Sequence, residues 1–306
     1  NVRFYEGLIK PFFIFVKNYF MIWILFAILS SASIFVIFKL LQRFSLPTLP
    51  VILVNYIVAT FFGFWLAGGI PHYNTTDMQW LLPAIIIGVL FIVNFFLMAY
   101  SAQNIGISIT TVAGKMSVII PMVFSIYFYS EDLPAFKIIG IVLAMAAVFM
   151  AVFKKDNGRF NPLKLIVPLI IFASMGVTDA LLKYAQDAYI SDDKAPVFSA
   201  SLFGIALILA FLFLTIRPKN FVQFSRWPVW LAGLVLGLVN FGSVYFVILA
   251  LNSKVFDSSI VFGITNICIV TISALVGGLV FREKLSVVNI VGIVLSVAAI
   301  AIFMWT

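Results

Sequence analysis

Charge is what this sequence has least of. Charged residues make up 10% of the 306 residues and hydrophobic residues 64%, whereas soluble domains carry roughly 25% charged residues. The apolar residues form long runs rather than short alternating segments, which predicts an all-helical integral membrane protein. The few charges are mostly basic and lie between the runs. There they indicate topology and contacts with membrane lipids, and no nucleic-acid partner is expected.

Cysteine and histidine occur once each. Cys268 lies in an apolar run with no second cysteine for a disulfide or a metal site, and His72 lies in a connecting loop. No metal, haem or other cofactor is therefore expected, and a Ser–His relay is excluded. Asp179 has no second intramembrane aspartate, so an intramembrane enzyme is not expected either. No Gly-Lys-Ser/Thr loop is present, so ATP does not drive the protein directly.

Ten apolar runs are long enough to cross a bilayer, which takes about 20 residues. The predicted spans are residues 20–39, 48–68, 81–102, 108–129, 134–153, 164–184, 196–216, 229–251, 258–281 and 286–305. Short connections predict that consecutive helices pack as antiparallel neighbours. Residues 1–19 fit either an interfacial helix on the membrane or a leader segment. The polar residues 154–163 are the expected linker between the halves 20–153 and 164–305.

The second half of the chain repeats the first. Residues 139–143, Ile-Gly-Ile-Val-Leu, return 152 positions later as Val-Gly-Ile-Val-Leu, and Val93-Asn94-Phe95 returns 146 positions later as Val-Asn-Phe. Five spans per half is an odd number, so the two copies have opposite orientations in the bilayer. Such inverted repeats place a binding site between the halves and allow it to open alternately to either side. The repeat therefore predicts a transporter.

Lysine and arginine predict the orientation of the chain in the membrane. Loops after odd-numbered spans carry eleven of them, and the opposite side carries seven. Positive loops stay in the cytoplasm, so both termini are expected outside. The chain is expected to be a multi-pass protein of the cell (inner) membrane.

Each half ends with an acidic-Leu loop and a Gly-rich last helix. The residues are Glu131, Leu133, Gly140 and Ala147 in the first half, and Glu283, Leu285, Gly292 and Ala299 in the second. With ten helices in two five-helix repeats, residues 20–305 resemble the drug/metabolite transporter superfamily, EamA type. Lys39 stands where these proteins often keep a lysine, while Ala27–Ser31 departs from their common Trp-Gly pattern. The resemblance implies transport of small metabolites through a central cavity. Helices one to four and six to nine would surround it, with five and ten outside.

Lys115 is the foremost candidate for substrate binding. It lies about 5 Å from the centre of the predicted fourth span, and a charge in hydrocarbon needs water or a partner. We expect it to face the cavity and bind a carboxylate or phosphate. The alternative is an ion pair with Asp179 that holds two helices together. Pro121 follows one to two turns later and predicts a kink that serves as a gating hinge.

Each of three acidic residues, Asp179, Glu131 and Glu283, allows two interpretations of its role. Asp179 lies four residues before Lys183, which favours a local ion pair; otherwise it is a proton-coupling or amine-binding carboxylate. Glu131 and Glu283 follow the fourth and ninth spans. We expect them to cap the next helix or to pair across a loop.

Asparagines form the neutral part of the predicted site. Asn94 and Asn240 occupy matching positions in spans three and eight, and Asn266 matches Lys115 within one residue. An asparagine donates and accepts hydrogen bonds, so this set can hold a small metabolite. The alternative is hydrogen bonding between helices. Weaker candidates for the same site are Asn55, Tyr100 and Tyr245.

Together these residues predict a secondary transporter that works by alternating access. An amino acid or a related carboxylate is the favoured small-molecule substrate, and export is the expected direction. The rival interpretation is a flippase for a lipid-linked sugar, or an efflux pump for amphipathic drugs, for which loss of Lys115 matters little. Coupling to a proton or to a substrate gradient stays open, as does the choice between a monomer and a homodimer.

Overall fold

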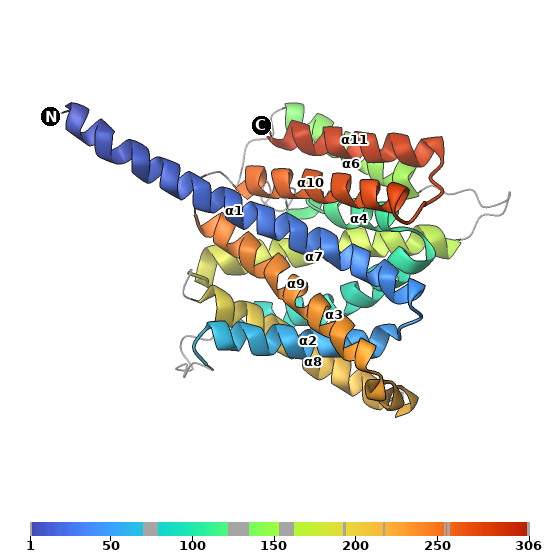
Figure 1. The fold of residues 1–306 in the computed structure, drawn as a ribbon. Helices are drawn as coiled ribbons and strands as arrows, with labels where there is room; N and C mark the ends of the chain where they lie inside the picture. The colour runs from blue at the N-terminus through green and yellow to red at the C-terminus, as the bar shows by residue number, and fades with distance from the viewer. Residues whose placement is uncertain are drawn as a thin grey trace.

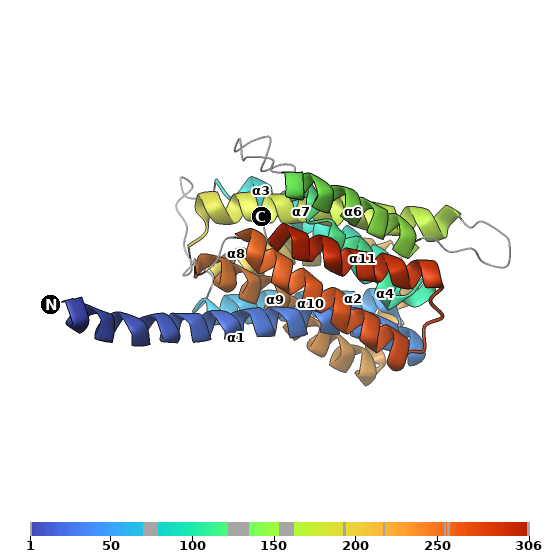
Figure 2. The ribbon, with the colours of Figure 1, turned by 90° about the horizontal axis from the view of Figure 1, so that it is seen from above.

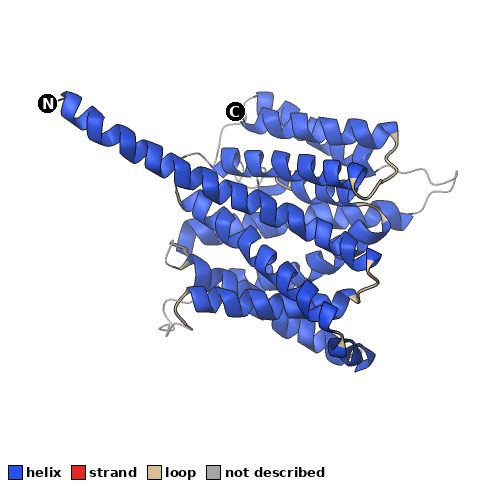
Figure 3. Ribbon diagram, in the orientation of Figure 1, coloured by secondary structure: helices blue, strands red, loops and turns tan. Residues whose placement is uncertain are grey.

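The computed structural model describes residues 2–69, 79–121, 135–152, 162–191, 194–216, 218–253, 255 and 258–304, and all regular structure in these ranges is helical (Figure 3). The first half contains α1 Val2–Arg43, α2 Thr48–Leu66, α3 Leu81–Asn104, α4 Ile107–Met116 and α6 Ala135–Val152. The second contains α7 Pro162–Tyr189, α8 Ala195–Thr215, the 3₁₀ helix η2 Pro218–Ser225, α9 Trp227–Asn252, α10 Ser258–Leu279 and α11 Val287–Met304. His72, Glu131 and most of the predicted linker lie outside the described residues.

Among the described residues, seven helices are long and apolar enough to cross a membrane, so the chain is a multi-pass membrane protein. They are α1 from Met21, α2, α3, α7 from Ile166, α8, α9 and α10 from Val261. The apolar helices α4, α6 and α11 are shorter. Large apolar side chains cover the outside of the bundle, such as Phe61, which is 72% exposed. Lipid tails are as apolar as these side chains, so their exposure is what a bilayer requires. Ten crossings in two inverted repeats stay a prediction.

Helix α1 is uninterrupted from Val2 to Arg43. The predicted boundary at residue 19 is therefore not a helix end, because residues 12–43 contain no glycine or proline that would break the helix. Figure 2 shows the N-terminal part of α1 extending beyond the rest of the bundle. The position of residues 1–19 relative to the bilayer stays a prediction.

The predicted fourth span, 108–129, is not one continuous helix in its described part. Helix α4 ends at Met116, and a turn at Ser117 separates it from the short helical segment that reaches Pro121. Proline has no N–H to donate to the Ser117 carbonyl. That carbonyl instead accepts a bond from the Ile120 N–H at 2.9 Å, in a tighter turn. The break in the helix thus lies one turn before the proline.

The main helix contacts join the two halves of the chain (Figure 1). Helix α1 packs against α9 and α10, α2 against α8 and α9, α3 against α7 and α8, and α6 against α11. The prediction that consecutive helices pack as neighbours is wrong for α1 with α2, holds only as a small contact for α2 with α3, and is right for α10 with α11. A short loop fixes only the distance between two helix ends. The sides of the helices still select the partners that fit them best.

The main helix contacts are preserved when the halves are exchanged. In chain order, α1, α2, α3, α4 and α6 correspond to α7, α8, α9, α10 and α11. The contacts of α1 with α9 and α10 then correspond to those of α7 with α3 and α4, and both sets are present. Helices α2, α4 and α6 each pack against their own counterparts. The two halves are therefore interleaved.

Glycines allow α2 and α9 to approach closely. A Cβ atom at Gly237 would lie 2.7 Å from the Asn55 carbonyl oxygen and 2.7 Å from Val58 Cβ. We expect Gly237→Ala to lower the free energy of unfolding by about 1–3 kcal/mol through overpacking, measured by thermal unfolding of the protein in detergent. Gly278→Ala is the matched control, because a Cβ there meets nothing within 4 Å. Equal stability of the two variants would contradict this close packing.

Candidate functional site

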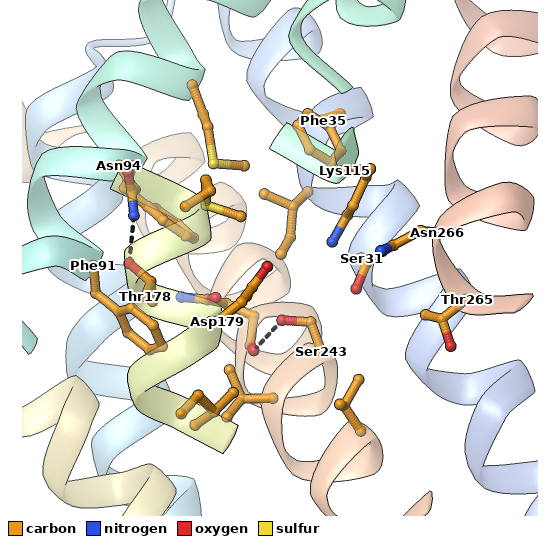
Figure 4. A pocket seen from close by; sticks show the side chains of 18 of the residues that line it. Ser31, Phe35, Phe91, Asn94, Lys115, Thr178, Asp179, Ser243, Thr265 and Asn266 are labelled. Atoms are coloured by element: carbon orange, nitrogen blue, oxygen red, sulfur yellow. Dashed lines mark hydrogen bonds between the residues drawn. The ribbon is translucent and has the colours of Figure 1, made fainter. Parts of the chain in front are cut away.

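A cavity of about 120 Å³ lies inside the bundle, between six helices (Figure 4). Helices α1, α3, α4, α7, α9 and α10 line it. Helices α6 and α11 pack on each other and do not line it, as the resemblance implied for helices five and ten. Helices α2 and α8 contribute no lining residue either, unlike the expectation. The polar lining residues are Ser31, Asn94, Lys115, Thr178, Asp179, Asn240, Ser243, Thr265 and Asn266.

Lys115 and Asp179 are the two charged residues in this lining. Figure 4 shows both side chains directed into the cavity, Lys115 from α4 and Asp179 from α7. Asp179 Oδ2 accepts a long hydrogen bond, 3.4 Å, from the Ser117 hydroxyl. Within the described part of the chain, no ion pair within 4.0 Å joins Asp179 to Lys115, although the two opposite charges attract each other. The direct Lys115–Asp179 ion pair of the alternative interpretation is therefore not formed, and both charges face the cavity.

Three polar side chains in the lining have no hydrogen-bond partner among the described residues: Ser31, Lys115 and Asn266. Ser31 and Asn266 are only 7% and 6% exposed. Their helices, α1, α4 and α10, pack against one another. Buried polar groups in proteins are nearly always hydrogen-bonded to protein or water. An ammonium, an amide and a hydroxyl left unpaired around one cavity therefore indicate a place for a polar ligand.

Asn94 and Asn240 reach the cavity but already have protein partners. Asn94 Nδ2 donates to Thr178 Oγ1 at 3.1 Å, and its Oδ1 accepts from the Ser174 hydroxyl, which ties α3 to α7. The Asn240 amide lies 3.1 Å from that of Asn55 on α2. These bonds match the alternative interpretation of both asparagines, hydrogen bonding between helices. Asn94 and Asn240 occupy matching positions in the two halves of the sequence, but they bond to helices that do not correspond, α7 and α2.

Three predicted site residues lie outside the cavity. Asn55 is fully buried against α9, where it meets Asn240. Tyr100 is 45% exposed and lines a different groove, formed with α2 and α8. Tyr245 stacks on Phe241, with ring centroids 5.3 Å apart, as a packing residue. Each of these residues lies on a side of its helix that faces a neighbouring helix or the exterior, and not the cavity.

Sequence reasoning missed four polar lining residues: Ser31, Thr178, Ser243 and Thr265. Thr178 and Thr265 are direct sequence neighbours of the predicted residues Asp179 and Asn266. Ser243 lies three residues after Asn240, and residues three apart lie on the same face of a helix. It also missed the apolar lining. That lining is rich in aromatic and methionine side chains, namely Phe35, Phe91, Phe95, Met98, Met175 and Phe262. The cavity therefore combines two opposite charges with a broad apolar surface.

Comparisons with known proteins agree with this description. Residues 18–153 match the family model of the EamA-like transporter family. An uncharacterized protein of Haemophilus influenzae is 28% identical over 284 residues, which cover 90% of this chain and 95% of that protein. A protein of known crystal structure has the same fold, with a TM-score of 0.58 over 92% of this chain and 94% of that chain at 17% identity.

The family match covers the first half of the chain, including Lys115 and Glu131. The matched family is described as one of transporters. The first half of the chain is therefore similar to the EamA-like transporter family, the type that the sequence resembles.

Proposed function

We propose that this protein is a secondary transporter of the cell (inner) membrane that exports an amino acid or a related carboxylate by alternating access. The observation that carries the proposal is the cavity, in which Lys115 and Asp179 present opposite charges without forming an ion pair. A ligand with both charges satisfies both groups at once. A lone anion or a lone cation leaves one buried charge without a partner, which is costly.

The proposed substrate has three points of attachment. Its carboxylate lies at the Lys115 ammonium, with the Asn266 amide and the Ser31 hydroxyl as further donors. Its ammonium group lies at Asp179. Hydrogen bonds to charged groups contribute roughly 1.5–3 kcal/mol each, and the aromatic and methionine side chains of the lining offer an apolar surface to the substrate side chain.

Alternating access is supported by the packing of the two halves. Exchanging the halves preserves the main helix contacts, so a second arrangement with the halves in exchanged roles would conserve most of the interface. The break in α4 at Ser117 allows the Lys115-bearing segment to move separately from the residues after it. Rocking of one repeat against the other around a fixed site is the motion expected of such proteins.

A second candidate function is a flippase for a lipid-linked sugar or an efflux pump for amphipathic drugs. The observation that favours it is the apolar share of the lining, which includes Phe35, Phe91 and Phe262. The two charges argue against it, since an apolar path needs neither of them. The two functions therefore differ in their dependence on Lys115.

The proposed function is tested by efflux from proteoliposomes. Vesicles are loaded with a mixed pool of amino acids, other carboxylates, nucleosides and cationic dyes, and the released compounds are identified by mass spectrometry. The wild type is expected to release amino acids or related carboxylates selectively, and Lys115→Ala is expected to lose that release. Protein-free vesicles give the leak rate. If no soluble compound leaves and a fluorescent lipid crosses between leaflets instead, the amino-acid assignment is wrong.

A further inference from the structure

Glu283 joins the two halves of the chain at one end of the bundle. It lies in the loop at residues 280–286, between α10 and α11. Its carboxylate accepts hydrogen bonds from the backbone N–H groups of Ile107 and Ser108, the second at 3.2 Å. It also accepts one from the Ser108 hydroxyl at 2.9 Å. These groups begin α4, so a residue of the second half caps a helix of the first.

The cap is not the one that sequence position suggests. Helix α11, the next helix after Glu283, has its own cap: Asn289 Oδ1 accepts from the Ser286 N–H at 3.0 Å, and Ser286 Oγ accepts from the Asn289 N–H at 3.2 Å. Glu283 is thereby left for α4. A carboxylate at a helix N-terminus is favoured by the free N–H groups and by the helix dipole.

Two glycines make room for the carboxylate. Gly106 has a φ of +144°, and a Cβ atom there would lie 3.2 Å from Glu283 Oε2. Gly277, in the last turn of α10, faces the same group: a Cβ atom would lie 2.6 Å from Ser108 Oγ and 2.7 Å from Glu283 Oε2. The Glu283 N–H also donates to the Gly277 carbonyl at 3.0 Å. We call this arrangement of Glu283, Ile107, Ser108 and the two glycines the Glu283 clasp.

The clasp connects directly to the cavity through α4 and α10. Lys115 lies eight residues after Ile107, about 12 Å along α4, and Asn266 lies eleven residues before Gly277, about 16 Å along α10. The two helices pack against each other. The clasp therefore joins the ends of the two helices that carry two of the unpaired polar groups, on the face of the bundle formed by residues 104–107 and 280–286.

We propose that Glu283 is a positioning residue whose clasp closes this end of the cavity and whose release opens it during transport. The inference rests on the proposed function, because it assigns the clasp to one state of an alternating-access cycle. Glu283 is only half-buried, so water can replace its bonds when the halves separate. Helix α4 ends at the Ser117 turn, which leaves it a short rigid segment that can tilt once its first residues are released.

The experiment measures the accessibility of the cavity from each face of the membrane. In a Cys268→Ser background, Ser243→Cys places one thiol in the cavity lining, and a membrane-impermeant maleimide is added to right-side-out or inverted vesicles. Glu283→Gln is expected to raise the labelling rate from the clasp face about tenfold or more, because hydrogen bonds to the charged group are lost. Labelling from the opposite face is expected to fall, since one closed state loses population to the other.

Three variants separate this role from general destabilisation. Lys284→Gln, an exposed change in the same loop, is expected to leave both rates unchanged. Ser108→Ala removes one bond and is expected to give a smaller rise, with little further effect in the Glu283→Gln background. If Glu283→Gln does not fold, the Ser108→Ala variant is used to test the proposal instead.

A protein that is only destabilised would be labelled faster from both faces of the membrane. That result, or an unchanged labelling rate from the clasp face, would overturn the proposal. Labelling needs no substrate, so a shift without amino-acid flux would reject the proposed substrate and retain the clasp.

Discussion

Transport of the amino acid is expected to fall about a hundredfold or more when Lys115 is replaced by methionine. Methionine keeps the length and the apolar stem of lysine and removes the ammonium group. The substrate carboxylate then loses its charged partner and faces Asp179 in the same cavity. Removing one partner of a buried ion pair costs about 3–5 kcal/mol, and each 1.4 kcal/mol is a factor of ten. The measurement is the initial rate of uptake into proteoliposomes below saturation, which reports kcat/KM.

Two further variants make this result specific. Lys115→Arg keeps the positive charge and is expected to retain part of the activity, because guanidinium also binds a carboxylate. Lys284→Met removes an exposed lysine and is expected to leave uptake unchanged. Undiminished uptake in Lys115→Met would remove the lysine from the substrate site.

Replacing Asp179 by asparagine is expected to change which substrate is preferred. Asparagine has nearly the same shape and no charge, so the substrate ammonium loses its partner while Lys115 keeps its own. We expect kcat/KM for an apolar amino acid to fall about tenfold to a hundredfold, the value of one charged hydrogen bond. The des-amino acid with the same side chain and carboxylate is expected to be transported as well as before or better. Uptake of the two labelled compounds is measured in parallel.

Asp187→Asn is the matched control for this second prediction. Asp187 lies on the same helix, α7, but is exposed and outside the cavity lining. Its replacement is expected to affect neither compound. Equal losses for the amino acid and its des-amino analogue in Asp179→Asn would mean that the carboxylate does not bind the amine. It would then have a structural role through its contact with Ser117.

Much of the site could be predicted because polar residues are rare in this chain. A charge or an amide within an apolar run needs a partner or water, and this argument, together with the matching positions in the repeat, selected Lys115, Asp179, Asn94, Asn240 and Asn266. All five line the cavity. The same argument selected Asn55, Tyr100 and Tyr245, which do not. A polar residue can find its hydrogen-bond partner on a neighbouring helix instead of in the cavity. Its position along a span does not show which of the two it faces.

Glu283 illustrates the same limit at a loop. Its position after the ninth predicted span indicates a cap on the next helix or a pair across the loop, whereas the structure shows it at the start of α4. The helix that it caps, α4, begins 176 residues earlier in the chain. That partner follows from the close packing of α10 on α4, which Gly277 permits. The sequence around residue 283 does not indicate which helix Glu283 caps.

The sequence by itself determined that this is a multi-pass helical membrane protein with a few buried polar residues, because runs of about 20 apolar residues have one stable arrangement in a bilayer. Only the tertiary structure decided which helices meet, which polar side chains share a cavity and where α4 breaks. In a membrane, the faces that contact lipid and the faces that contact other helices are both apolar. Hydropathy therefore specifies that a helix crosses, while the fit between side chains and glycines specifies which neighbours it has.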